Sequence, residues 1–147
     1  MGRPVTYTPT QHFSARGLFD RCESLWGGYV IEHAGHKIYF GGDAGYSSHY
    51  VDMFKKMGAM DLSLIGIGAY EPRWFMKSIH MNPSEAVQAH KDLHSKKSIA
   101  MHFGTFQLAG EGIDQPILDL DTAREKAGIT KDQFDHMLEG ETRVFTF

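Results

Sequence analysis

The residues Asn82-Pro83-Ser84-Glu85 mark the start of a helix and are the clearest local signal in the chain. Asn is a favoured N-cap, Pro suits the first helical position, and a Glu three residues after the cap completes a capping box. We expect this helix to run to about His94. It lies between two short apolar runs, 62–67 and 98–101, that are typical of strands. Alternation of strands and helices predicts an α/β fold.

Other segments extend this pattern along the chain. A short connection containing glycine, His33-Ala34-Gly35-His36, joins two strand-like runs and predicts a β-hairpin. Residues 68–80 lack a clear period and are expected to form a long ordered loop. Further strands are predicted at 5–8, 25–32, 37–40 and 142–145, and further helices at 51–57, 122–127 and 131–138. No linker or repeat divides the chain, so one domain is expected.

Composition excludes several classes of partner. A formal net charge of −3 gives no field that would attract nucleic acid or an anionic membrane. No stretch approaches the roughly 20 apolar residues of a membrane span. Cys22 is the only cysteine of 147 residues, and Met1 to Thr6 lack the regions of a signal peptide. These features together predict a cytoplasmic protein.

Three side chains that can bind a metal follow predicted strands directly. His12, Asp43 and His102 lie on loops at strand ends, where α/β folds place their active sites. Two imidazoles and a carboxylate suit Zn or Fe and leave positions open for water. A hydrogen-bonded structural role is the alternative for each residue taken alone. A single ion held by these three residues alone is a second form that the site can take.

Other motifs do not support a site. His90 and His94 share a helix face, but Lys91 stands where a metalloprotease helix needs its glutamate, so we expect a solvated or capping role for both histidines. Glu71 and Pro72 interrupt a possible dinucleotide fingerprint at 66–68. No serine nucleophile elbow is present.

Five motifs in the same order resemble a known family. The chain is similar to the metallo-β-lactamase-fold phospholipase D that hydrolyses N-acyl-phosphatidylethanolamines and to its bacterial relatives, from about Val5 to the C-terminus. The motifs are Gln11-His12-Phe13, Gly42-Asp43-Ala44-Gly45-Tyr46, Ile67-Gly68-Ala69-Tyr70-Glu71-Pro72-Arg73-Trp74, Asn82-Pro83-x-Glu85-Ala86-Val87 and Met101-His102-Phe103-Gly104-Thr105-Phe106.

The resemblance implies an αββα sandwich, of which residues 1–147 are the C-terminal half: a mixed sheet with helices on one face. It also implies two zinc ions that activate water for attack on a phosphodiester. His12 would complete the first zinc's ligands, Asp43 would bridge the ions and act in catalysis, and His102 would bind the second. His80 would hydrogen-bond the phosphate or the leaving group. Tyr46, Tyr70 and Trp74 would line the substrate groove, with core packing as the alternative.

The family's His-x-His-x-Asp-His loop is not found in these residues. We therefore expect little or no hydrolase activity from this chain alone. The inner face of its sheet should be uncovered, which favours self-association or pairing with an N-terminal half. A metallo-lactonase and a non-catalytic remnant or assembly module are the alternative functions.

Overall fold

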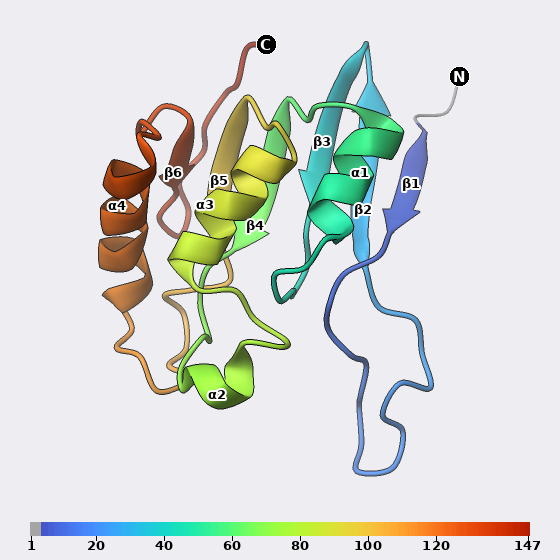
Figure 1. The fold of residues 1–147 in the computed structure, drawn as a ribbon, viewed down its shortest axis with the longest axis vertical. Helices are drawn as coiled ribbons and strands as arrows, with labels where there is room; N and C mark the ends of the chain where they lie inside the picture. The colour runs from blue at the N-terminus through green and yellow to red at the C-terminus, as the bar shows by residue number, and fades with distance from the viewer. Residues whose placement is uncertain (1–3) are drawn as a thin grey trace.

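The protein forms one six-stranded mixed sheet with its strands in chain order, β1-β2-β3-β4-β5-β6. The computed structural model describes residues 4–147. The expectation that Met1 to Thr6 lack the regions of a signal peptide therefore lies partly outside the described residues. Figure 1 shows the strands side by side in sequence order. They are β1 (Val5–Thr8), β2 (Gly28–His33), β3 (His36–Phe40), β4 (Leu62–Gly66), β5 (Lys97–Met101) and β6 (Phe134–His136).

The first three strands pair antiparallel and the remaining pairs are parallel. β2 and β3 form the expected hairpin, in which His33 pairs with His36. The turn residues Ala34 and Gly35 have φ of 52° and 84°, the positive values that a two-residue turn of type I′ requires.

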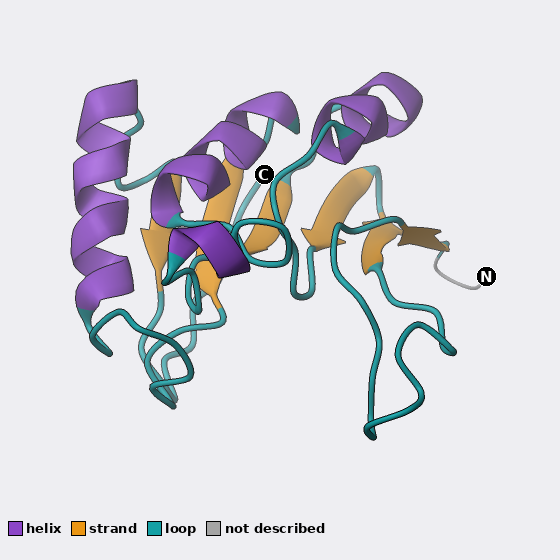
Figure 2. Cartoon of the chain, turned by 60° about the horizontal axis from the view of Figure 1, so that its bottom comes forward, coloured by secondary structure: helices purple, strands orange, loops and turns teal. Residues whose placement is uncertain are grey.

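The parallel strands are joined by helices, as such connections require. The helices are α1 (His49–Met57), α2 (Arg73–Met76), α3 (Pro83–Asp92) and α4 (Gln115–Ala127). Figure 2 shows them on one side of the sheet, which confirms the expected α/β arrangement. The capping box of α3 is also confirmed: the Asn82 side chain accepts the Glu85 N–H at 2.9 Å, and Glu85 accepts the Asn82 N–H at 3.2 Å. None of the helices among residues 4–147 is long and apolar enough to cross a membrane.

The core lies between the sheet and these helices. Val30, Tyr39, Ile65 and Phe134 point from the strands into it and are almost fully buried. Side chains on the opposite face of β1, β2 and β3 lie in register: Tyr7 beside Tyr29, and Tyr29 beside Phe40. These three are 42–44% exposed, which is unusual for a run of aromatic side chains on a sheet. The second face of the sheet is therefore largely bare at this end.

Two predictions near the C-terminus were wrong. Residues 131–138 form no helix; they contain strand β6, which pairs with the edge of β5 and buries Phe134 completely. Burial of this large ring against the core outweighs a weak local helix preference.

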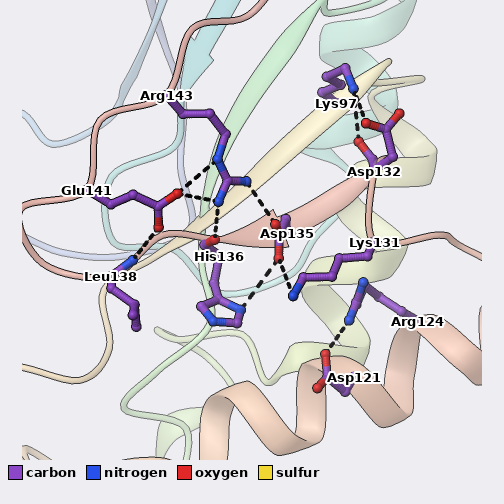
Figure 3. Close-up of polar contacts among 10 residues, drawn as sticks. All are labelled: Lys97, Asp121, Arg124, Lys131, Asp132, Asp135, His136, Leu138, Glu141 and Arg143. Carbon is purple, nitrogen blue, oxygen red and sulfur yellow. Dashed lines mark hydrogen bonds and ion pairs between the residues drawn. The ribbon is translucent and has the colours of Figure 1, made fainter.

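Residues 142–145 form no strand. Figure 3 shows the Arg143 side chain between Asp135 and Glu141, donating at 2.8 Å and 2.5 Å. These ion pairs hold the segment by a side chain, where a strand would be held by its backbone.

Two boundaries also differ from expectation. Helix α4 begins at Gln115, earlier than the predicted position 122, because Pro116 is tolerated in a first turn. The loop predicted at 68–80 contains the short helix α2.

Candidate metal centre

The candidate ligands come together at one edge of the sheet. β3 and β5 run in the same direction, because each is parallel to β4. β1 shares this direction, because β1 and β3 are both antiparallel to β2. The loops after these strands carry His12, Asp43 and His102. Gly45 N–H donates to the Gln11 carbonyl at 2.8 Å, which holds the first two loops together. Strand direction thus explains why residues distant in sequence meet here.

The candidate side chains lie close to one another. His102 Nε2 is 3.3 Å from Asp43 Oδ1, and His12 Nε2 is 3.3 Å from His80 Nε2. One ligand atom each from His12, Asp43 and His80 lie within 4.8 Å of one another. The structure thus gathers His12, Asp43 and His80 into one group of possible ligands, and His102 lies beside Asp43.

The orientation of His12 leaves one nitrogen available. Its Nδ1 lies 2.8 Å from the Phe13 carbonyl, and a carbonyl can only accept, so Nδ1 carries the proton. The lone pair is then at Nε2, which faces His80. A hydrogen bond from the outer nitrogen fixes a ligating imidazole in this way in many metal sites.

The electrostatics give Asp43 and His80 the protonation states that bind metals, whereas they favour the protonated form of His102. The hydrogen bond from His102, together with the nearby histidines, holds the pKa of Asp43 below its usual range. The same contact raises the pKa of His102. Burial, with the repulsion of the neighbouring histidines, lowers the pKa of His80 to about 4. Asp43 is therefore ionised and His80 neutral near pH 7, as metal ligation requires.

The backbone around His102 is tightly constrained. His102 has a φ of 60°, in the left-handed region that non-glycine residues rarely adopt. A Cβ added at Gly68, after β4, would lie 2.2 Å from the His102 carbonyl oxygen. Only glycine permits this contact between the two loops.

The donor set fits part of a divalent metal site. Three imidazoles and one carboxylate are the ligands that zinc and iron take in proteins. His12, Asp43 and His102, with His80 beside them, are the residues that would hold such an ion. They do not amount to the ligands of two ions.

The three expected substrate residues have different surroundings. Tyr46 donates from its hydroxyl to Asp92 on α3 at 2.5 Å. Tyr70 is 4% exposed and donates to Asp119 on α4 at 2.6 Å. Trp74 on α2 is 86% exposed. The two tyrosines hold helices in place, whereas Trp74 is free to contact a ligand.

A cavity of about 300 Å³ adjoins His102 and was not expected. Its wall includes Phe103, Phe106, Leu108 and Ile113, from the loop after β5. The apolar residues that follow the His102 motif are the signal that sequence reasoning passed over.

His90 and His94 lie away from the centre. His90 is 4% exposed, and its Nδ1 is 2.8 Å from Ser98 Oγ, so the expectation of a solvated or capping role was wrong for it. His94 stacks on Phe54, with ring centroids 3.8 Å apart. A helix face packed on the sheet buries His90, which the spacing alone could not show.

Comparison with known proteins identifies the family. The model of the beta-lactamase superfamily domain matches residues 1–103. The chain belongs to the metallo-β-lactamase superfamily. It is similar to the N-acyl-phosphatidylethanolamine-hydrolyzing phospholipase D 1 of Caenorhabditis elegans, with 45% identity over 110 residues that cover 73% of this chain and 31% of the relative. It is also 29% identical over 107 residues to a UPF0173 metal-dependent hydrolase of Heliobacterium modesticaldum, over 71% of this chain and 38% of the relative.

The fold of this superfamily member agrees with solved structures. Igni18, a metallo hydrolase from Ignicoccus hospitalis, superposes with a TM-score of 0.71 and 24% identity over 99% of this chain and 54% of its own. The chain spans about a third of the length of the first curated relatives that it matches, 31% and 34%.

Proposed function

We propose that this chain is part of a zinc-dependent hydrolase that cleaves phosphodiester bonds in the manner of a phospholipase D. The convergence of His12, Asp43, His80 and His102 from four separate segments is the observation that carries the proposal. The name of the Caenorhabditis elegans relative supports the substrate class, because that protein hydrolyses N-acyl-phosphatidylethanolamine.

Each candidate residue of this chain would have its own role in binding zinc or substrate. His12, Asp43 and His102 would hold zinc, which when bound supplies Lewis acidity to a phosphoryl oxygen. His80 remains neutral near pH 7 because its pKa is lowered to about 4. A neutral imidazole can donate one hydrogen bond to the phosphate or the leaving oxygen. Trp74, exposed on α2, would contact the rest of the substrate.

We infer further that residues 1–147 are a single C-terminal half-domain. The bare aromatic face of β1, β2 and β3 would then be covered by an N-terminal half carrying the remaining ligands, or by a second copy of this chain. The proposal places the protein in the cytoplasm, in keeping with the exposed thiol of Cys22.

Zinc stoichiometry and turnover test the proposal. We expect the isolated chain, dialysed against zinc, to bind fewer than two ions and to hydrolyse bis(p-nitrophenyl) phosphate at close to the uncatalysed rate. Two tightly held ions with rapid turnover would contradict the half-domain proposal. One ion held unaided would indicate a mononuclear site.

A pair of variants locates the bound zinc. Asp43→Asn should weaken zinc binding, because the amide carries no charge to balance the ion. Asp52→Asn is the control, since Asp52 is an exposed carboxylate on α1 that pairs with Lys55. Equal zinc affinity in the two variants would show that the centre does not hold the metal.

A further inference from the structure

The segment between β4 and α3 carries His80 but has little regular structure of its own. It contains only the four-residue helix α2. Two hydrogen bonds attach its end to the other ligand loops: the Gln11 side chain donates to the Ser78 carbonyl at 3.0 Å, and Met81 N–H donates to the Ala44 carbonyl at 3.0 Å. These bonds fix the residues on either side of His80.

Arg73 contacts the backbone of His80 directly. Its Nη1 donates to the His80 carbonyl at 3.0 Å and to the Tyr70 carbonyl at 3.2 Å. One planar guanidinium thus ties the beginning of the segment to the residue that enters the metal centre. The second nitrogen of the guanidinium, Nη2, is left free for another partner, whereas lysine has one nitrogen only.

The guanidinium is itself held by a rigid element. Arg73 Nη2 donates to Glu85 Oε2 at 2.7 Å, and both side chains are mostly buried, with 24% and 20% exposed. The same Glu85 oxygen accepts the Asn82 N–H of the capping box. Arg73 is therefore anchored on the first turn of α3. Charge-assisted bonds of this kind are stronger than neutral ones.

We propose that Arg73 is a positioning residue, which fixes the backbone at His80 so that its imidazole faces His12 and His102. The ring centroid of His80 is 5.1 Å from each of these two rings. Arg73 acts through the His80 carbonyl and through Glu85. The inference rests on the proposed function only in assigning His80 to the site.

Nuclear magnetic resonance of the metal-free chain tests this role with Arg73→Lys. Lysine keeps the positive charge, but its single nitrogen cannot take the positions of both Nη1, which serves the two carbonyls, and Nη2, which serves Glu85. We expect the cross-relaxation between the His80 ring and the His12 and His102 rings to be lost. Amide hydrogen exchange at residues 79–81 should rise roughly tenfold or more, as the loss of charge-assisted hydrogen bonds would produce.

Arg124→Lys is the matched control. Arg124 is a buried arginine of α4 that pairs with Asp121 (Figure 3), and it lies outside the segment that carries His80. It should leave the ring contacts of His80 unchanged. If Arg73→Lys also keeps them, or only speeds exchange uniformly along the chain as a general loss of stability would, the inference is overturned.

A second variant keeps the test decisive if Arg73→Lys does not fold. Glu85→Gln still accepts the Asn82 N–H but removes the charge that holds Arg73. Local loosening at His80 supports the inference, and its absence overturns it. A chain that shows the ring contacts but binds no zinc would count against the proposed function and leave the role of Arg73 standing.

Discussion

At Gly68 the backbone of the loop after β4 touches the backbone of the loop that carries His102. Gly68→Ala would place a Cβ 2.2 Å from the His102 carbonyl, so one of the two loops must move. We expect a loss of about 1–3 kcal/mol in the free energy of unfolding, typical of overpacking. Denaturant titration measures the loss.

Gly112→Ala is the control for this substitution. A Cβ at Gly112 meets no atom within 4 Å. Its effect should stay within about 0.5 kcal/mol. A Gly68→Ala variant as stable as Gly112→Ala would show that the two loops are not in close contact.

Strand patterns pointed to three of the candidate site residues, whereas His80 came only from the resemblance, and the difference has a physical reason. His12, Asp43 and His102 follow strands, and strand ends meet at one edge of a sheet. His80 follows no strand and is held at the centre by a hydrogen bond from the Arg73 side chain to its carbonyl and by the bond from Met81 to Ala44. Such bonds depend on the folded arrangement, so the resemblance gave His80 a role near the pocket but not its position among the ligands.

Helix α3 is packed against the sheet through a buried histidine. Burial lowers the pKa of His90 to about 4, from an ordinary value of 6.5. Between these pH values the unfolded chain binds a proton at His90 that the folded chain excludes. Stability should therefore fall as the pH falls from 6.5 to about 4, by about 3 kcal/mol from this residue at 1.36 kcal/mol per pKa unit.

The variant His90→Gln isolates this contribution. Glutamine does not titrate, so the variant should lose less stability than the wild type over the same pH interval. The free energy of unfolding, measured by urea titration at pH 6.5 and pH 4.5, gives the comparison. Equal losses in the two proteins would contradict a buried neutral His90.

Most elements were predicted because they carry local signals. The capping box of α3 and the glycine turn between β2 and β3 each lie within a few residues, and both are confirmed. Strand β6 has no such signal: three residues pair with β5 and bury Phe134 in a core assembled from distant segments. Burial against distant segments therefore determines that β6 forms, and a pattern within a few residues cannot predict it.

For the molecule as a whole, the bare face of the sheet is the feature that most affects its behaviour in solution. Tyr7, Tyr29 and Phe40 form an aromatic row that remains 42–44% exposed. We expect the isolated chain to self-associate as its concentration rises, because burying this row removes apolar surface from water. Size-exclusion chromatography with light scattering measures the mass.

Phe40→Lys should shift the chain toward the monomer. Leu118→Lys is the control, because Leu118 is 58% exposed on α4, on the other side of the sheet. A chain that stays monomeric at high concentration, or that responds equally to both substitutions, would contradict association through this face.

The sheet order has a consequence for how the protein is made. Each strand pairs with the strand that precedes it in the chain, from β1 to β6, as the colours of Figure 1 show. During synthesis every new strand can therefore pair with the strand made just before it. No strand needs a partner from a more distant part of the chain to join the sheet. Pairings between sequence neighbours close shorter loops than pairings between more distant strands would, which lowers the entropic cost of forming the sheet. The candidate metal centre, by contrast, has all the ligands that this chain supplies only after His102 has left the ribosome.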